Sequence, residues 1–235
     1  MEITEQHLRV LAADVDEQHR HGMASLPAQI DELHRGEGRG VLAPPRPSTL
    51  IGTTLVAGAL TIPLAAAMRA YAADSGDGGV AAFAESVELA AVEAYKAAAA
   101  SGKVTVKAVL DAATMFAGHH QEHAAAFGAA AGSAATKKPN PKLLEAVGGQ
   151  LAGAADQAAI LKIAFDLENA AAATYIFALG ALTSKAALQL TASILPVEAQ
   201  HAVVLGQVLG LAATAYLPSF ETSAAAVTPD KFPIA

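Results

Sequence analysis

Histidine and glutamate recur at helical spacing in the second half of the chain, where most other residues are small or apolar. His120 and His123 lie three positions apart, and so do Glu198 and His201. Residues three apart on a helix share one face, so each pair offers two ligands to a single point. The 235-residue chain contains no cysteine, so any metal must be held by Asp, Glu and His.

A carboxylate followed by a tyrosine seven positions later forms a second recurring pattern. Glu88 precedes Tyr95 in this way, and Glu168 precedes Tyr175. Seven positions are about two helical turns, so the members of each pair lie on one face. The two patterns together form a repeat with a period of about eighty residues, which predicts two similar helix pairs that face each other.

Four helices would thus direct ionisable side chains into an alanine-lined interior. A buried ionised carboxylate must be neutralised or must meet a cation, and carboxylates facing imidazoles suit a hard metal ion. Interior carboxylates hydrogen-bonded to tyrosine or histidine, in a bundle that has lost its metal, remain the alternative. The residues predicted to bind metal are Glu88, His120, His123, Glu168, Glu198 and His201.

The helical pattern predicts an all-α fold. Long helices with short connections pack as an antiparallel four-helix bundle, here over residues 80–209 with an internal two-fold repeat. The tail, residues 210–235, contains three prolines and is expected to be irregular and to wrap the bundle. The predicted helices are 80–100, 104–131, 154–181 and 184–209, with a short helix at 141–150.

The segments AFAESVELAAVEAY, DLENAAAATY and SILPVEAQHA make this part of the chain resemble a ferritin-like domain of the di-iron carboxylate superfamily, in its exported bacterial branch. The family pattern is Glu on the first helix, Glu-x-x-His on the second, Glu on the third and Glu-x-x-His on the fourth. The resemblance implies a bundle that binds iron, with manganese or zinc as alternatives, and that reacts with oxygen or peroxide.

One position departs from that pattern, because His120 stands where the family has a bridging glutamate. The change removes a negative charge, so we expect weaker di-iron binding, a single metal ion, or a softer choice such as zinc. A register that uses His119 and Glu122 instead breaks the repeat and stays as an alternative. In the favoured register His119 is a surface residue or a neighbour of the ligands, and Tyr95 and Tyr175 are packing residues and hydrogen-bond donors. Solvated faces are predicted for Glu93, Glu122 and Glu145.

Residues 1–46 form a charged extension that reads as one amphipathic helix, or as two broken at Pro27. Half of the eight histidines lie here among charged neighbours, which favours a solvated helix over a metal site. These histidines are His7, His19, His21 and His34.

Residues 47–73 resemble an export signal or a membrane anchor. Residues 47–68 carry no charge and reach the ~20 residues needed to span a bilayer as a helix. The arginines all precede Asp74, which predicts a cytoplasmic N-terminus and an extracytoplasmic bundle. Cleavage before Ala73 and retention as an anchor both remain open, as does a buried helix of a cytoplasmic protein.

The charge distribution argues against nucleic acid as a partner. The net charge is −7, and the lysines beyond Asp74 are scattered, so the sequence offers no basic stripe for nucleic acid. Metal ions, a membrane through residues 47–68 and a second copy in a homodimer are the partners we expect. Two functions fit: a metal-handling, redox-active protein, or a non-catalytic helical bundle of the cell envelope.

Overall fold

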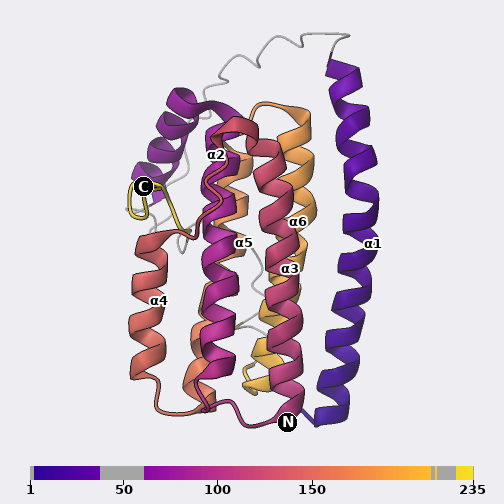
Figure 1. Cartoon of the computed structure of the whole chain (residues 1–235), viewed down its shortest axis with the longest axis vertical. Helices are drawn as coiled ribbons and strands as arrows, with labels where there is room; N and C mark the ends of the chain where they lie inside the picture. The colour runs from indigo at the N-terminus through magenta and orange to yellow at the C-terminus, as the bar shows by residue number, and fades with distance from the viewer. Residues whose placement is uncertain (1–2, 38–60, 213–214, 216–225, 235) are drawn as a thin grey trace.

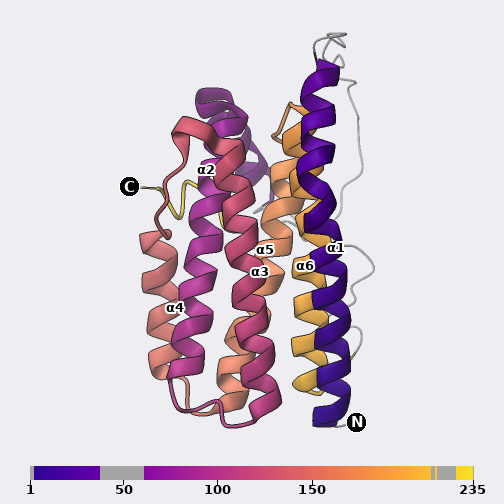
Figure 2. The same cartoon turned by 45° about the vertical axis from the view of Figure 1, so that its right-hand side comes forward.

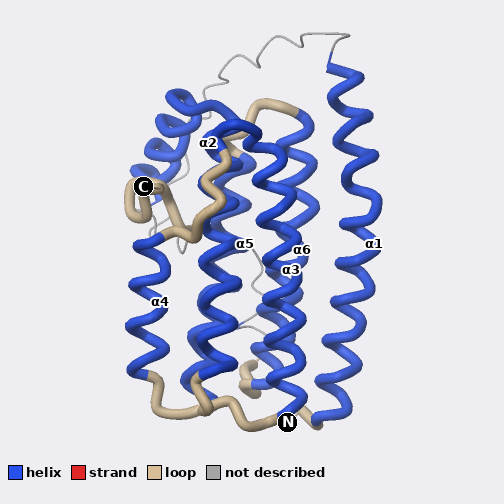
Figure 3. Tube along the Cα trace, viewed as in Figure 1, coloured by secondary structure: helices blue, strands red, loops and turns tan. Residues whose placement is uncertain are grey.

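The computed structural model describes residues 3–37, 61–212, 215 and 226–234, with the side chains of 29–74 excluded. Within these residues every regular element is helical (Figure 3). The elements are α1 (Glu5–Glu37), α2 (Thr61–Ala100), α3 (Lys107–Ala131), the short 3₁₀ helix η1 (Gly132–Ala134), α4 (Pro141–Gly153), α5 (Gln157–Leu179) and α6 (Lys185–Val208).

Helices α2, α3, α5 and α6 run side by side and form the four-helix bundle (Figure 1). The two helices within each sequential pair, α2 with α3 and α5 with α6, run antiparallel. The crossover that contains α4 returns the chain along the bundle, so α3 and α5 begin at the same end. The all-α fold and the bundle agree with the prediction.

At each end of the bundle, a side chain from one helix pair accepts hydrogen bonds from backbone N–H groups of the other. At one end Asp77 accepts hydrogen bonds from the backbone N–H groups of Thr183 (3.0 Å) and Ser184 (2.6 Å), which satisfy the start of α6. At the other end the side-chain oxygen of Gln157 accepts from the N–H groups of Thr105 (3.0 Å) and Val106 (3.1 Å). These bonds fix the two helix pairs in register.

The first bundle helix begins earlier than the expected residue 80. α2 starts at Thr61 and changes direction at Gly76, whose φ of 64° lies in the left-handed region that glycine adopts without strain. Figure 1 shows the two parts of α2 meeting at a sharp angle. The first part includes residues 61–73 of the predicted export segment, while residues 47–60 lie outside the described part of the chain.

The described part of the C-terminal tail, residues 226–234, lies against the bundle. The N–H of Val227 donates to Thr174 Oγ1 (2.8 Å), and Asn140 Nδ2 donates to the carbonyl of Phe232 (2.9 Å). Ala226 and Val227 are buried beside apolar residues of α2, α4 and α5. The tail thereby covers the crossover side of the bundle.

Helix α1 packs against α3 and α6 along the side of the bundle (Figure 2). It is a single helix with Pro27 inside it, which is the first of the two alternatives that the sequence left open. Its buried face follows a three-four spacing that matches the helical period. That face comprises Leu8, Ala12, Val15, His19 and Leu26.

The predicted topology, with a cytoplasmic N-terminus and an extracytoplasmic bundle, stays a prediction. Among the described helices, none combines the length and the apolar character that crossing a bilayer requires.

Replacing Leu8 tests the docking of α1. Leu8 is 3% exposed and packs with Phe116 and Val204, so Leu8→Ala should lower the free energy of unfolding by about 2–5 kcal/mol. Val10 on the same helix is 52% exposed, and Val10→Ala should change it by less than about 0.5 kcal/mol. Urea denaturation measures both, and equal effects of the two substitutions would contradict the docking.

Candidate metal centre

Six ionisable side chains from the four bundle helices meet in the middle of the bundle. α2 contributes Glu88, α3 contributes His120 and His123, α5 contributes Glu168, and α6 contributes Glu198 and His201. Each of them is 1% exposed or less. The structure therefore brings together all six side chains that the sequence predicts to bind metal.

The six residues form two overlapping groups whose potential ligand atoms lie within 4.8 Å of one another. Both groups contain His120 and Glu198, one from each of the helices that carry paired ligands. Their remaining members, arranged about this shared pair, are Glu88 and His123 in one group and Glu168 and His201 in the other. The spacing of three on α3 and on α6 produces this arrangement, because both members of each pair face the bundle axis.

The two tyrosines connect the helix pairs reciprocally. Tyr95 on α2 donates its hydroxyl hydrogen to Glu168 on α5, and Tyr175 on α5 donates to Glu88 on α2. Burial and the nearby carboxylates raise the pKa of both tyrosines well above the usual value, so both stay protonated donors. The reciprocal contacts reproduce the two-fold relation that the sequence repeat predicts.

His120 lies between the two carboxylates that the tyrosines hold. Its Nδ1 is 2.7 Å from Glu88 Oε2, and its Nε2 is 3.1 Å from Glu168 Oε1. A third carboxylate oxygen, Glu198 Oε2, lies 3.9 Å from Nδ1. The imidazole thus contacts both carboxylates at the position where the family pattern has a bridging glutamate.

Glu198 and His123 have polar atoms that are buried without a hydrogen-bond partner. His123 Nδ1 approaches Glu198 Oε1 to 2.9 Å, but both ring nitrogens of His123 and both oxygens of Glu198 remain without a hydrogen bond of acceptable geometry. His201 Nδ1 lies 3.5 Å from Glu198 Oε2. Buried polar atoms without partners are costly, so a ring nitrogen of His123 and a carboxylate oxygen of Glu198 are candidates to bind an ion.

Interactions within the cluster favour ionised carboxylates and protonated imidazoles. Burial opposes ionisation of Glu88, but His123 and His120 outweigh it and lower the pKa of Glu88 to about 2. Burial likewise disfavours the protonated form of His123, but Glu88 and Glu198 raise its pKa to about 9. The carboxylates shift the pKa of His120 and His201 upward as well, and the histidines hold that of Glu168 well below its usual range. Without metal, protons on the imidazoles balance the carboxylates.

Two further histidines, which the sequence analysis set outside the site, lie beside it. His119 is 3% exposed, and its Nδ1 lies 3.0 Å from Nε2 of His201, so it is a buried neighbour and not a surface residue. His19 of α1 is 1% exposed and stacks on His119 with ring centroids 3.9 Å apart. The prediction of a solvated His19 is therefore wrong, because the face of α1 that carries His19 packs against the bundle. His7 and His21 are exposed, as expected.

The remaining acidic residues lie away from the cluster. Glu93, Glu122 and Glu145 are exposed, as predicted. The Glu122 side chain is 54% exposed, and its Oε2 lies 4.0 Å from Nδ1 of His19. A ligand pair made of His119 and Glu122 therefore does not face the other carboxylates.

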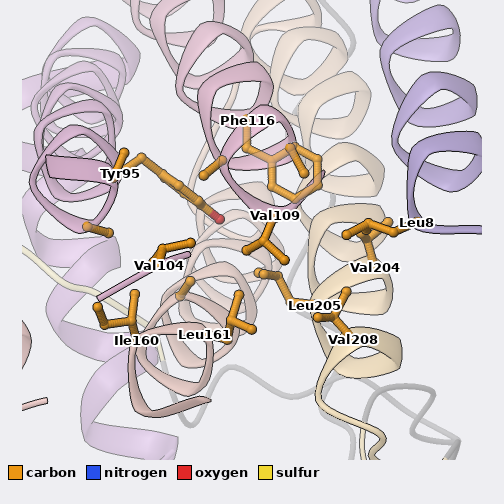
Figure 4. Close-up of a pocket in the computed structure, with 15 residues that line it drawn as sticks. Leu8, Tyr95, Val104, Val109, Phe116, Ile160, Leu161, Val204, Leu205 and Val208 are labelled. Atoms are coloured by element: carbon orange, nitrogen blue, oxygen red, sulfur yellow. The ribbon is translucent and has the colours of Figure 1, made fainter. Parts of the chain in front are cut away.

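A small apolar cavity of about 30 Å³ lies next to the cluster, at the end of the bundle where α3 begins. Tyr95 and Phe116 line the side nearest the site, and Val109, Leu161 and Leu205 line the rest (Figure 4). Phe116 also stacks on His201, with centroids 4.0 Å apart. The cavity presents hydrocarbon to the site and adds no ligand to it.

The stability of the metal-free protein should depend on pH in a defined direction. The raised pKa of His123 contributes stability that is complete below pH 6.5 and is lost as the pH rises through about 9. The lowered pKa of Glu88 contributes stability that is present above pH 4.5 and is lost as the pH falls toward about 2. We expect Tm after chelation to fall between pH 6.5 and 9, by roughly 2–4 °C for each kcal/mol lost. Thermal scans should show a smaller fall for His123→Gln, and an equal fall would contradict this assignment.

Comparison with known proteins identifies the family but supplies no individual relative. A family model described as a ferritin-like domain matches residues 76–211, which span the four bundle helices and all six clustered residues. No curated protein and no solved structure matches the chain. The family match covers more than half of the sequence, so the chain belongs to the ferritin-like domain family.

Proposed function

We propose that the six clustered side chains bind divalent metal ions, with iron as the preferred metal and manganese or zinc as alternatives. The observation that carries the proposal is the pair Glu198 and His123, whose four polar atoms are buried without hydrogen bonds. An ion at this point would bind one ring nitrogen of His123 together with a carboxylate oxygen of Glu198. The donor set of carboxylate oxygens and imidazole nitrogens suits all three metals.

The charge of the site favours the divalent state. Glu88, Glu168 and Glu198 supply three negative charges, and the imidazoles are neutral when they bind a metal. Two trivalent ions would leave a much larger uncompensated charge in the buried interior than two divalent ions. His120 in place of a fourth carboxylate therefore predicts a modest affinity for an oxidised pair.

Bound iron would supply electrons to oxygen or peroxide, which is the activity that the family resemblance suggests. The chain's own contribution is to bind the ion and to restrict its surroundings. Tyr95 and Tyr175 hold Glu168 and Glu88 by hydrogen bonds, and the apolar residues next to the site exclude water. Release of protons from the imidazoles must accompany metal binding, so affinity should rise with pH.

A metal-free structural bundle is the second candidate, and His120 is the observation that favours it. A protonated His120 contacts Glu88 and Glu168 at hydrogen-bond distance and so performs the neutralising role of a cation. In that case the protein would be a non-catalytic bundle of the cell envelope, alone or as a homodimer. Metal content distinguishes the two functions.

The metal proposal predicts opposite effects of two substitutions. Glu198→Gln should weaken ferrous iron binding by about tenfold or more, because it removes a charged member of both ligand groups. His120→Glu should strengthen binding of the second ion, because it restores a fourth carboxylate, while His120→Gln should not. Elemental analysis after anaerobic loading and the rate of ferrous oxidation measure these effects.

Glu145→Gln provides a matched control, because Glu145 is exposed on α4 and away from the cluster. It should bind iron like the parent. If the parent binds no iron, manganese or zinc and His120→Glu gains none, the metal proposal is wrong and the structural bundle takes its place.

Export of the bundle is a further part of the proposal, supported by the uncharged run at residues 47–68 behind an arginine-rich extension. A reporter that is active only outside the cytoplasm, fused after Ala235, should be active. Equal activity of a cytoplasm-restricted reporter fused at the same position would contradict export.

A further inference from the structure

Helix α1 lies outside the family match, yet it places two side chains against the candidate metal ligands. Asp16 and His19 are three positions apart on the helix face that packs against the bundle. His19 stacks on His119, and Asp16 Oδ1 lies 3.2 Å from His119 Nε2. The contact between α1 and the site therefore runs through His119.

A continuous chain of contacts leads from the protein surface to the buried carboxylates. Asp16, whose side chain is 30% exposed, meets His119, whose Nδ1 is 3.0 Å from His201 Nε2. The other nitrogen of His201, Nδ1, lies 3.3 Å from Glu168 Oε2. Each imidazole thus uses one nitrogen toward the surface and one toward the site.

The carboxylate at the outer end sets the direction of these hydrogen bonds. Partial burial opposes ionisation, but the hydrogen bonds from His119 and Arg20 lower the pKa of Asp16, so its oxygens only accept. Asp16 Oδ1 lies 3.2 Å from His119 Nε2, and a carboxylate oxygen can only accept, so the hydrogen between these two atoms is on Nε2 of His119.

With the hydrogen of His119 on Nε2, His119 Nδ1 is the atom that can accept the N–H of His201 Nε2, 3.0 Å away. His201 Nδ1 then faces Glu168 and Glu198, and it is the nitrogen that would give up its proton to bind an ion. Stacking fixes both rings in this orientation, with Phe116 on His201 and His19 on His119. The opposite tautomer of His119 would set a lone pair against the Asp16 carboxylate.

We propose that Asp16 is a positioning residue of the metal centre, which acts through His119 to keep His201 Nδ1 available to the ion. The proposal rests on the proposed metal function and deepens it. Under this proposal α1, which the ferritin-like match does not include, helps to orient a metal ligand. Partners of this kind orient a histidine ligand and change metal affinity by about 10–100-fold.

The first test needs no variant and no metal. Nitrogen-15 chemical shifts of the histidine rings in the metal-free, full-length protein report which nitrogen carries the hydrogen. We expect His119 to carry a hydrogen on Nε2 and none on Nδ1. A His119 hydrogen on Nδ1 would overturn the proposal, since His201 would then be held in the opposite orientation.

The second test measures zinc affinity by competition with a chelating indicator, using zinc because it has no redox chemistry. Asp16→Asn keeps the size of the side chain but removes its charge and allows an amide N–H to face His119. We expect zinc binding to weaken about 10–100-fold, and Asp16→Glu, which keeps an ionised acceptor, to recover most of it. Asp14→Asn, an exposed position on the same helix, should stay within about twofold of the parent.

The results distinguish a failure of the proposed role of Asp16 from a failure of the proposed metal binding. Failure of the parent to bind zinc or iron contradicts the proposed function itself. Parent-like zinc binding by Asp16→Asn contradicts only the role of Asp16. Circular dichroism confirms that each variant retains its helices, and the chemical shifts of the parent decide the tautomer should a variant not fold.

Discussion

The burial of six ionisable groups in an alanine-rich bundle is the constraint on which the rest of the structure depends. Three carboxylates and three imidazoles are held at 1% exposure or less, where an unpaired charge would be prohibitive. The four bundle helices and α1 all help to hold these groups in place. The reciprocal tyrosines hold two carboxylates, the caps at the bundle ends keep the helices in register, and α1 covers the side where His119 and His201 meet.

His120 explains how one site can serve two states. Its ring contacts Glu88 and Glu168 together, so a proton on His120 neutralises the carboxylates when no ion does. In the proposed metal site, protons and metal ions would compete for the same groups, and metal affinity would depend on pH. A glutamate at this position would supply more negative charge to an ion but would leave the metal-free bundle with a fourth buried carboxylate to compensate.

The sequence predicts the bundle and the cluster well, because both depend on local spacing. Positions three and seven apart fall on one helix face, so the repeat identifies Glu88, Glu168 and the ligand pairs without tertiary information. The sequence does not predict that α1 packs against the bundle, because the row of residues that it buries is narrow and charged residues flank this row on both sides. His19 lies in that row, but only packing against α3 and α6 distinguishes it from exposed His21.

Anomalous X-ray diffraction tests the central claim most directly. Crystals of the full chain grown with ferrous iron should give, at the iron absorption edge, an anomalous peak within ligand distance of Glu198 and His123, flanked by Glu88 or Glu168. Data from the same crystals at the manganese and zinc edges identify the metal. A map without a peak, in which His120 still contacts both Glu88 and Glu168, would contradict a metal centre and leave a bundle neutralised by protons.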